Sequence, residues 1–140
     1  VLAAAADRWR IVFFHHPVYT AGKYQPAYRL REALLPVIER HGAALVLAGH
    51  NHMYERSHPM RGGQIVPPGR GTVHVTTGAG GDELYAPRAG HALEIAAQDA
   101  TQHSFTVIDV TPESLTVRQL NRDGDVIDEC LIPAPETTSP

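Results

Sequence analysis

The sequence predicts an α/β fold, and three observations carry the prediction. Residues 10–14 and 44–48 are short runs with the apolar, β-branched and aromatic content of buried strands. The segment between them, residues 26–41, repeats its apolar residues at helical spacing. Three further β-rich runs near the C-terminal end are separated by turn signals. We therefore expect a strand–helix–strand unit in a mixed sheet, followed by an antiparallel meander.

The helix over residues 26–41 fixes the direction of the strands on either side. Its apolar positions are Leu30, Leu34, Leu35, Val37 and Ile38. Gly42 supplies a stop signal, while Pro36 is expected to kink or divide the helix. Strand, helix, strand is the order that a right-handed crossover needs, so the two strands should lie parallel and end at the same edge.

Both of these predicted strands end in histidine. The first is followed by His15 and His16, and the second by Gly49, His50 and, two residues on, His52. In open α/β sheets ligands bind beyond the carboxyl ends of the strands, and neutral imidazole is a common ligand of zinc and iron. A His-x-His pair alone is as compatible with chance as with a metal site in a chain with nine histidines. The second strand end favours a shared site, in which three imidazoles converge on one metal or are divided between two.

The middle of the chain is rich in turn signals. Residues 57–71 read as loops, and residues 72–77 as a strand that ends in a glycine run at 78–81. We interpret the glycine run as a structural turn rather than a phosphate-binding loop, because it has neither P-loop spacing nor a lysine partner. His74, inside the strand, is interpreted as a satisfied core histidine, and Lys23 and Tyr24 as parts of a structural connector.

Residues 82–102 show no clear period, so they are interpreted as a long connection that borders the site or is mobile. His91 and His103 are read as exposed or supporting histidines rather than ligands. The meander covers residues 105–110, 114–120 and 126–132, with a hairpin signal at Asp123-Gly124, and is expected to add antiparallel pairs to the sheet. Residues 133–140 hold three prolines and read as a disordered tail.

Composition describes an ordinary globular chain. The 140 residues suffice for one domain with a core, and 43% of them are hydrophobic and 19% charged. A net charge of -3 gives no basic footprint for nucleic acid, and no segment has the pattern of a signal peptide or membrane span. Cys130 alone permits no internal disulfide and leaves the compartment open. The helix-favouring start at residues 1–8 reads as the end of a helix, so we expect a cleaved precursor or part of a larger protein.

Three motifs together carry a resemblance to a known family. They are Phe14-His15-His16-Pro17-Val18-Tyr19, Ala48-Gly49-His50-Asn51-His52-Met53-Tyr54-Glu55-Arg56 and Thr77-Gly78-Ala79-Gly80-Gly81. The chain resembles the C-terminal half of a calcineurin-like metallophosphoesterase, most of all the purple acid phosphatase branch, from about Trp9 to Ile132. The resemblance implies that residues 1–132 form the C-terminal half of a β-sandwich flanked by helices, with residues 133–140 as a tail.

The same resemblance implies a dinuclear centre of Fe, Zn or Mn ions. By it, His15 and His50 would be ligands of one metal and His52 a ligand of the other. His16 stands where the family varies and is our candidate for the catalytic acid that assists the leaving group. No substrate-binding residue is assigned. The Asp-containing and Gly-Asn-His motifs of the family do not occur in the chain, which would therefore supply only the histidine half of the site.

The function expected from these residues is hydrolysis of phosphate esters, with a phosphate-ester substrate and with the upstream half of the domain, or a second copy of the chain, as partner. Neither nucleic acid nor a membrane is expected as a partner. The rival is a non-catalytic half-domain that binds one metal or a partner chain, and a third reading is a structural module whose sheet edges are covered by self-association. The resemblance is compatible with a secreted or periplasmic location.

Overall fold

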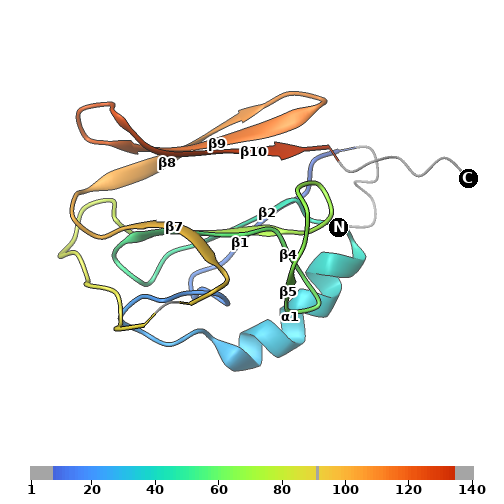
Figure 1. Ribbon diagram of the computed structural model, residues 1–140, viewed down its shortest axis with the longest axis horizontal. Coiled ribbons are helices and arrows are strands. Elements are labelled where there is room, and N and C mark those ends of the chain that lie inside the picture. The colour runs from blue at the N-terminus through green and yellow to red at the C-terminus, as the bar shows by residue number, and fades with distance from the viewer. Residues whose placement is uncertain (1–7, 91, 135–140) are drawn as a thin grey trace, which may run out of the picture.

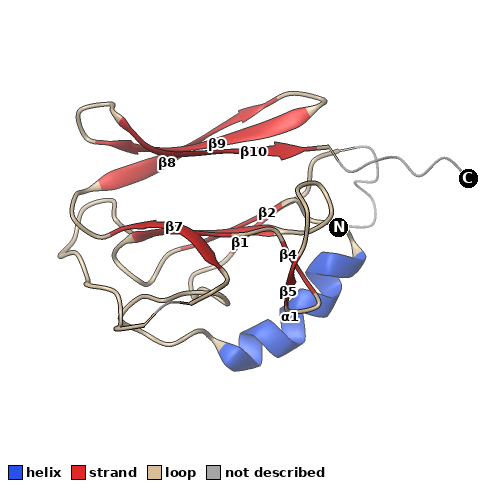
Figure 2. Ribbon diagram, in the orientation of Figure 1, coloured by secondary structure: helices blue, strands red, loops and turns tan. Residues whose placement is uncertain are grey.

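The chain folds into three layers in a computed structural model that describes residues 8–90 and 92–134. Figure 1 shows a three-stranded sheet over a five-stranded sheet, with a helix beneath the second sheet. Figure 2 shows long loops joining these elements on the side away from the chain ends. The helical start expected over residues 1–7, His91 and the tail from residue 135 lie outside the described residues. No helix in the described part is long and apolar enough to cross a membrane.

The five-stranded sheet is mixed, as predicted. Its strand order is β1 (Ile11–Phe13), β2 (Leu45–Ala48), β6 (Val73–Thr77), β3 (Tyr54–Ser57) and β7 (Ile95–Asp99). The first three strands are parallel, whereas β3 runs antiparallel to both of its neighbours. The two histidine-bearing strands, β1 and β2, are therefore direct neighbours with parallel direction, and their carboxyl ends meet at one edge.

Two strands of this sheet were not predicted. The interpretation of residues 82–102 as a long connection without secondary structure is wrong, because β7 lies within them, and no strand was predicted over residues 54–57, which form β3. Alanine and charged residues give these segments weak strand propensity, but β3 hydrogen-bonds on both sides and its Glu55 is buried. A small hairpin of β4 (Met60–Arg61) and β5 (Gln64–Ile65) also interrupts the predicted loops.

The helix α1 (Tyr28–Arg40) is continuous, so the expectation that Pro36 divides it is wrong. Proline in a helix interior removes one hydrogen bond and costs about 3 kcal/mol in isolation. Packing offsets this cost, because Ile38 lies in a buried cluster with Val46 of β2 and Leu34 lies against it. The helix ends at Arg40, and Gly42 follows just beyond it with a φ of 57°, in the region that glycine tolerates.

The meander consists of β8 (Ser104–Val110), β9 (Ser114–Asn121) and β10 (Val126–Pro133) in the order β10-β9-β8. It forms a separate sheet, which corrects the expectation that it would extend the first one. Side chains of β9 alternate between buried and partly exposed, and an apolar face of this kind must be covered. Leu115, Val117 and Ile132 pack in one core with residues of the lower sheet, so the two sheets make the sandwich that the resemblance implied.

One end of β10 extends beyond the predicted boundary of the tail. Pro133 pairs with Ser114, and the Ala134 N–H donates to the Glu113 carbonyl at 2.8 Å.

A polar link joins the two sheets. Asp128 of β10 accepts hydrogen bonds from the Tyr54 hydroxyl (2.6 Å) and the Arg56 guanidinium (2.6 and 3.0 Å) of β3.

Candidate metal site

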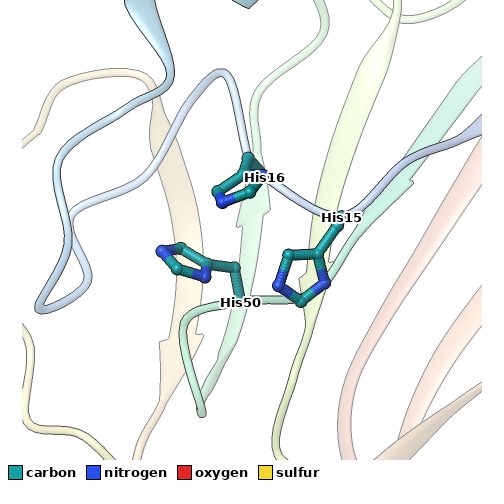
Figure 3. A group of neighbouring side chains, drawn as sticks. All are labelled: His15, His16 and His50. Atoms are coloured by element: carbon teal, nitrogen blue, oxygen red, sulfur yellow. The ribbon is translucent and has the colours of Figure 1, made fainter.

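Three histidines meet at the carboxyl ends of β1 and β2. His15 lies two residues beyond β1 and His50 two residues beyond β2. The strands are parallel neighbours, with Phe13 opposite Leu47, and the Gly49 N–H donates to the His15 carbonyl at 3.0 Å. Figure 3 shows the rings of His15, His16 and His50 turned toward a common space between the two loops.

The distances within this cluster, which we call the histidine triad (His15, His16 and His50), are short. Ring centroids lie 4.8 Å apart for His15 and His16, 5.1 Å for His15 and His50, and 4.3 Å for His16 and His50. One nitrogen from each ring lies within 4.8 Å of the others. The structure thus brings His15 and His50 together as predicted from parallel strands, and it adds His16, which the sequence assigned to catalysis.

His50 occupies a strained backbone position. Its φ is 66°, and it is the only non-glycine residue of the described ranges 8–90 and 92–134 with a positive φ. Such a conformation costs about 1–3 kcal/mol and persists only where the surroundings hold it. Here the Asn51 N–H donates to the Gly49 carbonyl and the Met53 N–H to the Asn51 carbonyl, both at 2.8 Å. These tight turns hold the backbone that carries the His50 ring.

His52 does not belong to the triad. Its ring stacks on Tyr85 with a centroid separation of 4.2 Å and an interplanar angle of 13°. Its Nδ1 lies 2.9 Å from the Glu83 carbonyl, and because a carbonyl only accepts, this nitrogen carries the proton. The Nε2 lone pair therefore stays available for a ligand, as in many metal-binding histidines. The division of His15, His50 and His52 between two metals stays a prediction.

Tyr24 lies between the two histidine positions, although it was interpreted from the sequence only as part of a structural connector. Its ring centroid lies 4.7 Å from that of His50 and 5.7 Å from that of Tyr85. The Lys23 ammonium lies 4.2 Å from the Tyr85 ring centroid. No spacing signal announces these contacts, because they depend on how the loop of residues 20–25 folds over the strand ends.

Asn51 holds that loop in place. Its side chain is fully buried, donates to the Thr20 hydroxyl (2.9 Å) and the Tyr24 carbonyl (3.1 Å), and accepts from the Tyr24 N–H (2.9 Å). The approach is so close that a Cβ on Gly22 would lie 2.5 Å from the Asn51 Cγ. Asn51 is thus a positioning residue that the sequence pattern did not single out.

Glu55 reinforces the same loop from β3. Its carboxylate accepts hydrogen bonds from the Ala21 N–H at 2.7 Å and from the Thr20 hydroxyl. Burial raises the pKa of Glu55 above its usual value, although these hydrogen bonds oppose the rise. Its contacts serve the loop, and it is not one of the residues grouped around the triad in the described structure.

The glycine run also shapes the site through its backbone. A Cβ on Gly78 would lie 2.0 Å from the Asn51 carbonyl oxygen, so only glycine fits beside the His50 turn. Nothing lies within 4 Å of the corresponding positions on Gly80 and Gly81. The close contact of Gly78 accords with the interpretation of this run as a structural turn.

The remaining described histidines singled out in the sequence lie away from the triad. His74 is 6% exposed within β6, as expected of a core residue, but its Nδ1 has no hydrogen-bond partner and so is not satisfied. His103 is exposed, with Nδ1 3.1 Å from the Ala79 carbonyl. Asp82 and Asp109 are not grouped with the triad either.

The chemistry of the triad fits one metal ion. Two nitrogens bound about 2.1 Å from one ion lie at most about 4.2 Å apart, so small side-chain rotations of the exposed His15 and His16 complete the convergence. Burial, followed by the neighbouring imidazoles, lowers the pKa of His50 and favours the neutral form that metals bind. No carboxylate joins the triad among the described residues. The donor set therefore suits a borderline ion such as zinc better than a hard ion.

Comparison with known proteins finds similarity to the family that the three motifs resemble. No family model matches the chain. Purple acid phosphatase 21 of Arabidopsis thaliana is 34% identical over 99 residues, which cover 69% of this chain and 21% of the plant protein. Tartrate-resistant acid phosphatase type 5 of Sus scrofa is 24% identical over 140 residues, which cover 94% of this chain and 38% of the pig protein. An uncharacterised protein of Mycobacterium tuberculosis is 33% identical over 90 residues, or 17% of its length.

Solved structures share the fold. A purple acid phosphatase from yellow lupin (Lupinus luteus) seeds superposes with a TM-score of 0.77 at 19% identity, covering 91% of this chain and 25% of the lupin chain. GAP50 of Plasmodium, described as the anchor in the inner membrane complex, superposes with a TM-score of 0.81 at 17% identity. The superposition covers 98% of this chain and 41% of the GAP50 chain. The chain thus has distant sequence similarity to purple acid phosphatases and the fold of part of a metallophosphoesterase, and it spans less than half the length of these relatives.

Proposed function

We propose that this chain is the histidine-bearing part of a metal-dependent phosphoesterase that hydrolyses phosphate esters at a dinuclear centre. The observation that carries the proposal is the convergence of His15, His16 and His50 beyond two parallel strand ends. Convergent imidazoles are a typical metal-binding arrangement, and this edge of an α/β sheet is where ligands bind. The distant similarity to purple acid phosphatases supports the same reaction class.

In this proposal His15 and His50 hold one ion and His52 the other, each ion being Fe, Zn or Mn. When bound, the pair of ions neutralises phosphate charge and lowers the pKa of a water molecule. The chain's own residues orient these ligands. The Glu83 carbonyl fixes the tautomer of His52, and Asn51 holds the loop that places Tyr24 beside His50.

His16 has two roles open to it within this function. As an exposed residue it can carry a proton to the leaving oxygen of the ester, which is the role expected from the sequence. Its ring centroid, 4.3 Å from that of His50, also puts it in reach of the ion that His15 and His50 would share. Metal affinity of a His16→Ala variant separates the two roles, because only a ligand contributes to affinity.

The missing carboxylates divide the work between this chain and a partner. Two cations held close together repel unless anionic ligands lie between and around them, and the triad has none among the described residues. We therefore expect the 140-residue chain to retain well under two ions after dialysis and to hydrolyse p-nitrophenyl phosphate poorly. The upstream half of the domain, or a second copy of the chain, would complete the centre.

A second candidate function is binding without catalysis. The observation that favours it is the same lack of a carboxylate at the triad, which leaves a site for one loosely held ion. Plasmodium GAP50, which shares the fold, is described as an anchor. Metal-dependent turnover in the assembled protein would decide for the enzyme.

The first experiment titrates cobalt(II) into the 140-residue chain and follows its absorption spectrum. His15→Ala and His50→Ala should each weaken binding at least about tenfold, since loss of a ligand or its support typically costs that much affinity. His103→Ala, an exposed histidine outside the triad, is the matched control and should bind as the wild type does. Equal affinity in all four proteins would refute the metal site.

The second experiment adds the upstream half and measures hydrolysis of p-nitrophenyl phosphate. Turnover should appear with metal, and His50→Ala or His52→Ala should lower the rate at least about 100-fold, because loss of a ligand displaces an ion. Metal binding without turnover in the assembled protein would favour the non-catalytic candidate. Efficient turnover by the 140-residue chain alone would contradict the divided centre.

A further inference from the structure

A polar cavity is lined in part by Thr20, at the start of the loop of residues 20–25. It has a volume of about 150 Å³, and the side chains that matter to the argument are those of Tyr19, Arg31, Arg88 and Glu94. None of them belongs to the histidine triad or to the residues proposed to hold metal. We call this space the arginine cavity.

Buried polar atoms without hydrogen-bond partners gather at this place. Across residues 8–90 and 92–134, four buried side-chain atoms have no hydrogen-bond partner. Two of them, the Tyr19 hydroxyl and the Arg88 Nη1, belong to residues that line the arginine cavity. A third, the Nδ1 of His74, belongs to a ring whose centroid lies 4.8 Å from that of Tyr19. An unsatisfied buried donor costs about 1–3 kcal/mol, and more when it is charged, so such a concentration indicates a missing partner.

Charged groups of both signs surround the cavity. The Arg88 Nη2 donates to the Thr20 carbonyl at 3.0 Å, and the Arg31 Cζ lies 4.2 Å from the centroid of the Tyr19 ring. Neither guanidinium forms an ion pair with a carboxylate of the described residues. Glu94 is the one acidic residue of the described lining, but Glu55 also interacts electrostatically with Arg88 and Glu39 with Tyr19, so the surroundings of the cavity carry no positive excess.

We propose that the arginine cavity binds a compact oxyanion, a phosphate or a small carboxylate. Tyr19 and Arg88 would supply the hydrogen bonds, and Arg31 would add positive charge at the wall. Water molecules would fit the volume and could satisfy the two free donors one at a time. An oxyanion accepts from the Tyr19 hydroxyl and the Arg88 Nη1 at once, and its hydrogen bond from the guanidinium is charge-assisted and therefore stronger.

The position of the cavity links it to the histidine loop. The Thr20 carbonyl accepts a hydrogen bond from Arg88, and the Thr20 hydroxyl accepts one from Asn51, the neighbour of His50. Arg88 also ties the segment after the glycine run to this loop, since its own N–H donates to the Ala21 carbonyl at 2.8 Å. An anion bound to Arg88 would therefore stabilise the loop that carries Tyr24. The inference does not depend on metal binding, so its test is independent of the test of the proposed function.

The test is titration of inorganic phosphate, and separately of acetate, into the metal-free 140-residue chain in the presence of a chelator. Binding is followed by amide chemical shifts in NMR spectra and by calorimetry. We expect saturable binding with shifts centred on residues 19–21 and 88. Arg88→Met should raise the dissociation constant at least about tenfold, because charge-assisted hydrogen bonds contribute that much. Response to phosphate alone or also to acetate identifies the class of anion.

Three further variants sharpen the test. Tyr19→Phe should weaken binding while leaving the anion-free protein at least as stable, because the substitution removes an unsatisfied buried hydroxyl. Glu94→Gln should tighten binding, since it removes the opposing charge. Arg118→Met is the matched control, because the Arg118 Nε is also buried without a partner but lies on β9, and this variant should bind like the wild type.

Three outcomes would overturn the proposal. One is the absence of saturable binding of either anion to the folded wild-type chain. Another is equal weakening by Arg118→Met and Arg88→Met, which would indicate a general charge effect. The third is binding that survives both Arg88→Met and Tyr19→Phe but disappears in His50→Ala, which would place the anion at the triad. Circular dichroism of each variant checks that it folds.

Discussion

Replacement of His74 by leucine should make the protein less sensitive to acid. His74 is 6% exposed in β6, and its Nδ1 is buried without a hydrogen-bond partner. Burial, and secondarily the positive charge of Arg31, lowers the pKa of His74 from 6.5 to about 3. The folded protein therefore keeps this imidazole neutral at a pH where the unfolded chain protonates it.

The sign and size of the effect follow from proton linkage. Between pH 6.5 and about 3 the unfolded state binds one more proton at His74 than the folded state, so the free energy of unfolding falls as the pH falls. Each pH step below 6.5 removes about 1.4 kcal/mol, and the loss amounts to about 3 kcal/mol at pH 4. His74→Leu abolishes this loss, and it also removes the unsatisfied nitrogen at neutral pH.

The assay is urea unfolding of wild type and variant between pH 7 and pH 4, followed by circular dichroism. Carboxylates that titrate in the same range affect both proteins equally, so the difference between the two pH profiles isolates His74. His103→Leu, at an exposed histidine, should follow the wild-type profile. Parallel loss of stability in the wild type and in His74→Leu would refute the reasoning.

Two further predictions concern packing at the site and between the sheets. Gly78→Ala should destabilise the fold by at least about 2 kcal/mol, since its Cβ would lie 2.0 Å from the Asn51 carbonyl oxygen. Gly80→Ala, the control, should change stability by less than about 0.5 kcal/mol, because nothing lies within 4 Å of the added Cβ. Equal melting temperatures of the two variants would contradict the close contact. Asp128→Asn should lower the free energy of unfolding by about 1–3 kcal/mol, because it weakens the partly buried pairing with Arg56. Asp123→Asn, in the exposed pair with Arg122, should lower it by less than about 0.5 kcal/mol in the same chemical unfolding experiment. Similar losses in the two variants would show that the inter-sheet link contributes little.

The acidity of Asp128 gives an independent measure of the same link. Burial alone would raise its pKa, but hydrogen bonds from Arg56 and Tyr54 outweigh burial and hold the pKa below the usual value. A lowered carboxylate pKa stabilises the folded state at neutral pH, and this contribution disappears as the pH falls through the folded pKa. Acid therefore destabilises the fold at both places: Asp128 loses the negative charge that pairs with Arg56, and the buried His74 must accept a positive charge.

Periodicity and turn chemistry sufficed to predict the helix, the parallel pair β1 and β2, the strand β6 and the three strands of the meander. These segments repeat a local pattern, and local pattern is what a sequence displays directly. β7 and β3 escaped prediction because their residues have little strand propensity of their own. They are strands because β6 offers β3 a free edge and β3 then offers one to β7.

The same division applies to the site. The sequence alone determined that His15 and His50 follow two parallel strands, and parallel neighbours end at one edge, so their proximity could be predicted. Only the tertiary structure decided which histidine joins them, because the φ of 66° at His50 and the course of the chain at His16 set the direction of each ring. The roles of Asn51 and Tyr24 and the partnerless donors of the arginine cavity depend on contacts between segments far apart in the chain, and such contacts leave no local pattern to read.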